Sequence, residues 1–195
     1  MKKQTILALA IATIIVMASA DPAMAYVLLS PRRTWASTPI NVPVYSAGNS
    51  TIADGNGGVT ATVNAIKTWG VVNSSSTNQA AVRGQAPATI TLNNNGKICN
   101  GTCLAATLTG YYNGNTIYDA DVYTNTKYKF YSSGENDECD DEFDIEGIMV
   151  HEVGHVIGIG HTSVIGATMY PSVSRCNTGN RSLEADDIAA KNNLY

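Results

Sequence analysis

The sequence predicts one domain of mixed α/β or α+β class, a sandwich in which helices pack against a sheet. Three observations support this class. Short alternating apolar runs, which are typical of strands, occur through the first two thirds of the 195-residue chain. One helical pattern lies early among these runs, and two more follow near the end. We therefore expect residues 26–195 to form a single domain with its own core.

Residues 1–25 have the layout of a secretory signal peptide. Two lysines precede a short apolar run, and Ala23-Met24-Ala25 is an A-x-A cleavage site. Cleavage after Ala20 and an uncleaved membrane anchor are the alternatives, although the apolar run is short for a membrane span. We expect secretion to an extracellular or periplasmic location, with no membrane span left after the signal is removed.

The first third of the domain shows one strand and one helix. Residues 40–45 alternate between apolar and polar side chains, and Pro43 within them indicates a bulge or an unpaired position. A glycine-rich loop at 54–58 follows. Apolar residues then recur at helical spacing over 59–69, and Gly70 ends the predicted helix.

The middle of the chain is expected to supply the remaining strands. Residues 71–88 are polar, and the sequence leaves a strand open at either 71–72 or 81–82. Clearer strands are predicted at 89–92, 104–108 and 117–123. The tyrosines between 111 and 131 could form a surface on which a ligand stacks, but half-buried strand faces are the more ordinary explanation.

Two helices are predicted in the last third. Asp144 is a suitable N-cap for a helix over 145–157, and the acidic residues before it suit a helix N-terminus. Gly147 and Gly154 within that helix suggest close packing, because glycine is unfavourable in a helix interior. A loop at 172–181 precedes the last helix, 183–194.

Charge and cysteine content narrow the class of protein. The chain has 12 basic and 16 acidic residues, a net charge of −4, and no basic stripe. Nucleic acid is therefore not an expected partner. Four cysteines in an exported chain indicate two disulfides, for which three pairings exist. We favour Cys99–Cys103, which brackets a tight turn, and this leaves Cys139–Cys176.

All three histidines of the chain lie within residues 151–161. On a helix, residues four apart lie on the same face about 6 Å along the axis, so His151 and His155 can bind one metal ion. Glu152 is adjacent to them and can act on a metal-bound water.

His161 requires the helix to end before it. If the helix continued, this side chain would point roughly 120° away from His155. Gly158 lies where a turn is needed, and glycine readily adopts the left-handed conformation that ends helices. Three protein ligands leave the fourth zinc position open, which is the arrangement of a catalytic site.

The motif H-E-x-x-H-x-x-G-x-x-H, with Ala167-Thr168-Met169-Tyr170-Pro171 after it, resembles the metzincin metallopeptidases. Among the metzincins, the chain is similar to the matrixins. Three features carry this similarity: Thr162 after the third histidine, the Met-Tyr-Pro turn and the pattern of residues 183–188. The resemblance implies a zinc endopeptidase. It also implies a twisted, mostly parallel five-stranded sheet, an active-site helix and a C-terminal helix.

The resemblance also implies roles for particular residues. The strand at 104–106 would be the edge that pairs with the substrate backbone. Met169 would lie beneath the zinc without binding it, and Tyr170 and Pro171 would line the pocket for the residue after the scissile bond. Glu152 would take a proton from the zinc-bound water as the water attacks the peptide carbonyl.

The chain departs from the matrixins in two ways. It has no further histidines for a second, structural zinc, and no cysteine between residues 26 and 98 for a latency segment.

Candidate ligands for a calcium ion are Asp119, Asp121 or the acidic residues of 135–144. A solvated acidic cluster that binds no ion is the alternative. We expect a monomer that acts on proteins or peptides. The rival function is a secreted zinc-binding or adhesion module with a vestigial peptidase site, for which Glu152 would be unnecessary.

Overall fold

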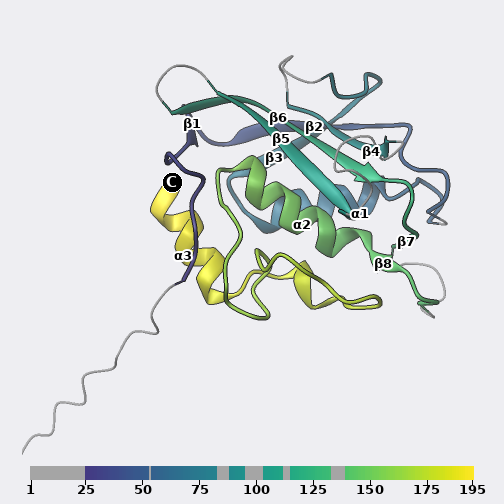
Figure 1. Ribbon diagram of the computed structural model, residues 1–195. Coiled ribbons are helices and arrows are strands. Elements are labelled where there is room, and N and C mark those ends of the chain that lie inside the picture. The colour runs from purple at the N-terminus through teal and green to yellow at the C-terminus, as the bar shows by residue number, and fades with distance from the viewer. Residues whose placement is uncertain (1–24, 53, 83–87, 95–102, 112–114, 133–138) are drawn as a thin grey trace, which may run out of the picture.

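The computed structural model of the protein describes residues 25–52, 54–82, 88–94, 103–111, 115–132 and 139–195. Within them, the α-helices are α1 (Val59–Thr68), α2 (Ile145–Val156) and α3 (Ala185–Leu194). The sheet covers one side of α1 and α2, while α3 and the loops after α2 lie on the other side (Figure 1). The predicted mixed α/β class is confirmed.

The main sheet has the order β1-β6-β4-β2-β3, and β5 pairs with the other side of β6. All of its pairings are parallel except β5 with β6, so the sheet is mostly parallel, as expected. The short β1 adds a sixth strand to the predicted five. Two further short strands, β7 and β8, pair separately. The strands are β1 (Thr34–Trp35), β2 (Ile40–Tyr45), β3 (Val72–Thr77), β4 (Ile90–Asn94), β5 (Ala105–Tyr111), β6 (Thr116–Asn125), β7 (Phe130–Tyr131) and β8 (Phe143–Asp144).

The polar stretch after α1 differs from the sequence expectation. It forms β3 over Val72–Thr77, with six residues in parallel register with β2, whereas residues 81–82 lie outside any strand. Only the first residue of β3 is buried. The strand therefore depends on backbone pairing at the edge of the sheet rather than on an alternating apolar face.

The core lies between the sheet and the helices α1 and α2, and it explains one glycine of α2. The fully buried Trp69, at the end of α1, donates a hydrogen bond from Nε1 to the carbonyl of Val150 (2.8 Å). A Cβ added at Gly154 would overlap the sulfur of Met169 and lie 2.8 Å from the Trp69 ring. Gly154 therefore permits α2 to pack closely on both side chains.

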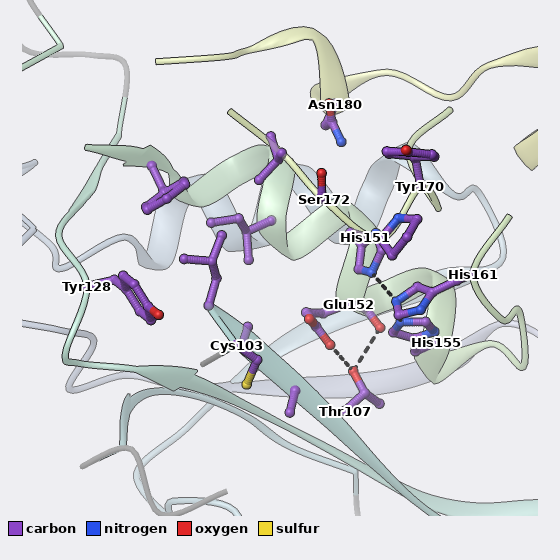
Figure 2. Close-up of a pocket in the computed structure, with 18 residues that line it drawn as sticks. Cys103, Thr107, Tyr128, His151, Glu152, His155, His161, Tyr170, Ser172 and Asn180 are labelled. Carbon is purple, nitrogen blue, oxygen red and sulfur yellow. Dashed lines mark hydrogen bonds between the residues drawn. The ribbon is translucent and has the colours of Figure 1, made fainter. Parts of the chain in front are cut away.

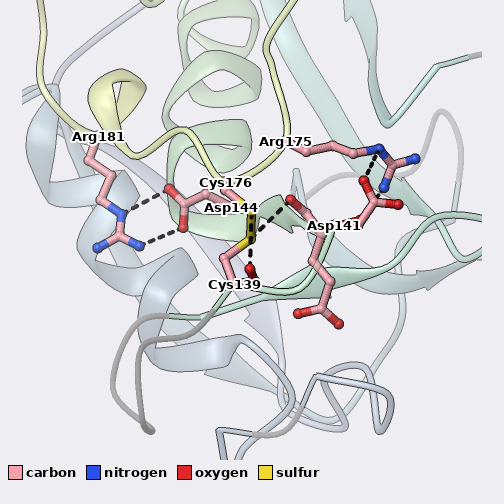
Figure 3. The surroundings of a disulfide bond; sticks show 7 residues. Cys139, Asp141, Asp144, Arg175, Cys176 and Arg181 are labelled. Carbon is pink, nitrogen blue, oxygen red and sulfur yellow. Dashed lines mark hydrogen bonds and ion pairs between the residues drawn. A yellow bond between two sulfur atoms is a disulfide. The ribbon is translucent and has the colours of Figure 1, made fainter.

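The loop at 172–181 is tied to the N-terminal end of α2 (Figure 3). Cys139 and Cys176 form a disulfide, the pairing left by the sequence argument, with an S–S distance of 2.07 Å. Arg181 forms a two-pronged ion pair with the buried Asp144, at 2.7 and 2.8 Å. The predicted Cys99–Cys103 bridge involves Cys99, which lies outside the described residues.

Two of the calcium candidates are side by side within the sheet. Asp119 and Asp121 lie two apart on β6, both almost completely buried. Burial, with the nearby Asp119 carboxyl, raises the pKa of Asp121 to about 6 from its ordinary 3.8, against the effect of hydrogen bonds from Thr89 and Tyr123. Its negative charge is therefore unfavourable in the folded protein.

This raised pKa leads to a pH-dependent prediction for Asp121→Asn. A carboxyl whose pKa is higher in the folded state contributes most to stability below about pH 3.8, and that contribution is lost as the pH rises towards 6. The neutral asparagine should therefore gain stability over the wild type between pH 4 and 7, by at most about 3 kcal/mol. Urea unfolding at several pH values measures the difference.

The exposed Asp140→Asn is the control for removal of a carboxylate at the surface, and it should change the free energy of unfolding by less than about 0.5 kcal/mol. A pH-independent difference for Asp121→Asn would contradict the prediction. Repeating the series with millimolar calcium tests the predicted calcium site as well, because a cation bound at this pair would make the asparagine variant the less stable protein.

No helix in the described part of the chain is long and apolar enough to span a membrane.

Candidate metal centre and active site

Helix α2 carries His151, Glu152 and His155. Its N-cap is Asp144, whose side chain accepts a hydrogen bond from the Gly147 amide (2.9 Å), as the sequence predicted. One helical turn separates the two histidines, so both rings lie on the same side of α2 (Figure 2).

The chain reverses after α2 at Gly158, which has a φ of +101°. A side chain there would overlap the carbonyl oxygen of Arg33, so both conformation and space require glycine. The returning segment pairs with the N-terminal segment. Leu28 forms an antiparallel bridge with Ile159, and the Gly160 amide donates to the Val27 carbonyl (2.7 Å). This pairing positions His161, the next residue.

The three imidazole rings converge, as the predicted turn requires. The Nε2 atom of His161 lies 3.2 Å from Nε2 of His155 and 3.2 Å from Nε2 of His151. On their other sides, Nδ1 of His151 donates to the Thr168 carbonyl (2.7 Å) and Nδ1 of His155 donates to the Ile159 carbonyl (2.8 Å). Carbonyl oxygens only accept, so in the neutral rings these Nδ1 atoms carry the protons and the Nε2 lone pairs point inward.

This donor set fits one divalent cation. Nitrogen ligands at about 2.0–2.1 Å from a tetrahedral zinc lie about 3.3 Å apart, close to the spacing observed. Burial and the neighbouring His151 lower the pKa of His155 to about 3, so its ring is neutral at ordinary pH. Inward-facing lone pairs on neutral rings repel one another unless a cation lies between them. The three histidines can therefore hold a zinc ion.

Glu152 is buried beside the histidines and faces β5. Its side chain is 5% exposed, and Oε2 accepts a hydrogen bond from Oγ1 of Thr107 (2.6 Å). Burial raises the pKa of Glu152, whereas His151 and the Thr107 hydrogen bond act in the opposite direction. The site therefore places a carboxyl of raised pKa next to three potential metal ligands.

A cavity of about 520 Å³ opens beside these groups. The start of β5 and the helix α2 form two of its walls, and Tyr170 and Pro171 form part of a third. Away from the histidines its lining is largely apolar, and includes Leu104, Tyr128, Phe143, Ile148 and Val173. Such a recess can receive an apolar side chain from a bound peptide.

Met169 packs against α2 and does not line the cavity. It is 1% exposed, and its sulfur lies against Gly154. Asp187, in α3, stabilises the turn that contains Thr168 and Met169. Its Oδ2 accepts from the Thr168 amide (2.8 Å) and its Oδ1 from the Met169 amide (3.0 Å). Since Thr168 also accepts from His151, Asp187 supports one of the candidate ligands.

Asp187→Asn should loosen this turn. An asparagine side chain has one accepting oxygen, so either the Thr168 or the Met169 amide would lose its buried partner. The expected cost is about 1–3 kcal/mol in the free energy of unfolding. Chemical denaturation of the variant measures the cost, with the exposed Asp140→Asn as the control. Equal stability of Asp187→Asn and the wild type would contradict this role.

Comparison with known proteins identifies the family. The model of the matrixin family matches residues 45–195. The chain belongs to the matrixin family. Its helices and mostly parallel sheet are consistent with a matrixin catalytic domain, and membership implies dependence on zinc.

Several known proteins are similar to part of this chain. Metalloendoproteinase 1 of Glycine max is 37% identical over 84 residues, which are 42% of this chain and 25% of that protein. Metalloendoproteinase 4-MMP of Arabidopsis thaliana is 42% identical over 52 residues, or 27% of this chain and 15% of that protein. Matrilysin of Rattus norvegicus is 42% identical over 48 residues, or 25% of this chain and 18% of that protein. The matched stretches span a quarter or less of these relatives.

Two residues of this matrixin site were not singled out from the sequence. Thr107 reaches the site from β5 and lies 45 residues before its partner Glu152. Asp187 reaches it from α3 and lies 18 residues after its partner Met169. A threonine in a strand is common, so Thr107 carries no sequence signal. Asp187 belongs to the matrixin-like pattern at 183–188, but that pattern does not indicate its contact with the amides of Thr168 and Met169. Among the described residues, His151, His155 and His161 are the one group of three or more side chains placed to hold a metal. The calcium site stays a prediction.

Proposed function

We propose that residues 26–195 form a zinc-dependent endopeptidase that hydrolyses peptide bonds in proteins. The observation that carries the proposal is the convergence of three Nε2 atoms next to the buried Glu152, at the wall of a cavity. The names of the similar proteins, metalloendoproteinases among them, support the same class of reaction.

His151, His155 and His161 would hold the zinc ion through Nε2. When bound, zinc lowers the pKa of a water towards 7 and polarises the scissile carbonyl. Glu152 accepts the proton of the attacking water and passes it to the leaving amine, which it can do because its pKa is raised by burial. The backbone carbonyls bound to Nδ1 of His151 and His155 fix the tautomer in which Nε2 is the ligand atom.

Substrate would bind as an extended chain along β5. In the described part of the structure, β5 pairs with β6 on one side only, so its other edge can add a peptide strand. The side chain after the scissile bond would enter the cavity next to Tyr170 and Pro171. The apolar lining favours an apolar residue at that position.

The same proposal includes export. Residues 1–25 would act as a signal peptide, and the protein would function as a monomer outside the cytoplasm. The disulfide between Cys139 and Cys176 supports an oxidising compartment, because such bridges persist there.

Cleavage of a proteome-derived peptide library by the exported, purified protein tests the proposal. We expect cleavage that stops with 1,10-phenanthroline and returns on addition of zinc. A protein that binds zinc but cleaves no peptide would contradict the endopeptidase proposal and support the rival zinc-binding module.

A further inference from the structure

Thr107 places its hydroxyl between β5 and the carboxyl of Glu152 (Figure 2). Oγ1 lies 2.6 Å from Oε2 of Glu152 and 3.1 Å from the Glu152 carbonyl oxygen. When Glu152 is ionised, both of these oxygen atoms can only accept a hydrogen bond, and the threonine hydroxyl has one hydrogen to donate. The shorter distance is typical of an O–H···O⁻ hydrogen bond, so the proton is donated to the carboxylate.

This hydrogen bond distinguishes the two oxygens of Glu152. Oε2 is held by Thr107, and among the described residues no other side chain hydrogen-bonds the carboxyl. Oε1 is therefore left to exchange a proton with water and substrate. A glutamate side chain has several rotatable bonds, so one fixed oxygen greatly restricts the positions that the other can occupy.

Thr107 is itself held firmly. It lies opposite Val122 in the antiparallel β5–β6 ladder, with regular pairing from Ala105 to Gly110. Threonine is branched at Cβ, and its χ1 rotation is restricted. The hydroxyl is thus presented from a rigid strand, the same strand whose free edge would bind the substrate.

We propose that Thr107 is a positioning residue for catalysis, which holds Glu152 by Oε2 so that Oε1 is available to the attacking water. The proposal rests on the endopeptidase function proposed above. A proton-transfer group must be within hydrogen-bonding reach of the proton that it takes, so a carboxylate free to rotate would transfer the proton less often. Thr107 does not touch the substrate's reacting atoms in this scheme and acts through Glu152 alone.

Thr107→Val tests the proposal, because valine keeps the branched shape and lacks the hydroxyl. We expect kcat to fall about 10- to 100-fold, the equivalent of one lost hydrogen bond to a charged group, with KM within twofold of the wild type. Thr107→Ser keeps the hydroxyl and should stay within about threefold of the wild-type kcat. Thr116→Val makes the same change at the exposed start of β6, outside the cavity lining, and is the matched control that should leave kcat unchanged.

Zinc content and melting temperature are measured for each protein purified from expression of the full chain. A purely structural hydrogen bond would lower the melting temperature without a selective loss of kcat. If the valine variant does not fold, Thr107→Ala takes its place, with the same expected fall in kcat. A valine or alanine variant with kcat within twofold of the wild type, a loss confined to KM, or a serine variant as impaired as valine would overturn the proposal. A zinc-loaded wild type that cleaves no peptide would instead overturn the proposed function, and the role of Thr107 with it.

Discussion

Replacing Glu152 by alanine is expected to abolish peptide hydrolysis while zinc stays bound. The three Nε2 atoms would be unchanged, because Glu152 is not among the group of candidate ligand atoms. The reaction would lose the side chain that takes the proton of the attacking water, and positioned acid–base groups contribute about 10²–10⁴-fold to rate. We therefore expect kcat/KM to fall by about 10³-fold or more, with one zinc per chain by elemental analysis.

Glu146→Ala is the matched control, since Glu146 lies on the same helix but does not line the cavity. This variant should cleave the reporter peptide at close to the wild-type rate. Near-normal turnover by the Glu152→Ala variant would show that another group takes the proton.

Replacing His161 by alanine should remove both the metal and the activity. Two nitrogen ligands on α2 would remain, and the third ligand nitrogen, Nε2 of His161, would be lost. Since loss of an outer hydrogen-bond partner alone weakens metal binding about 10- to 100-fold, loss of a ligand should cost at least about 100-fold in zinc affinity. Competition with a chromogenic chelator measures the affinity directly.

The His161 side chain is exposed, so the fold without metal should tolerate this change. Ser163→Ala, in the same loop, is the control and should keep wild-type zinc affinity. Stoichiometric zinc in the His161→Ala variant, held as tightly as in the wild type, would contradict its assignment as a ligand. The two substitutions therefore separate proton transfer from metal binding.

The geometry of the histidines could be predicted because it depends on local rules. Helix periodicity places His151 and His155 on one face, and no continued helix could bring His161 to them. A turn was therefore required, and the φ of +101° at Gly158 supplies it. The mostly parallel sheet, the active-site helix and the C-terminal helix were predicted from a different source, the resemblance to the matrixins.

Contacts between distant parts of the chain were less accessible from the sequence. The polar strand β3 has no apolar alternation, because its stability comes from the ladder with β2. Thr107 meets Glu152, and Asp187 meets Met169, only after the sheet, α2 and α3 have packed together. Sequence periodicity describes which face a residue occupies, whereas these pairs depend on which two faces come into contact.

Anomalous X-ray diffraction at the zinc edge, on crystals of the purified wild-type protein, tests the central assignment most directly. We predict one zinc ion per chain, bound by Nε2 of His151, His155 and His161 at about 2.0–2.1 Å. A protein without stoichiometric transition metal, or a zinc ion bound away from these three rings, would contradict the account.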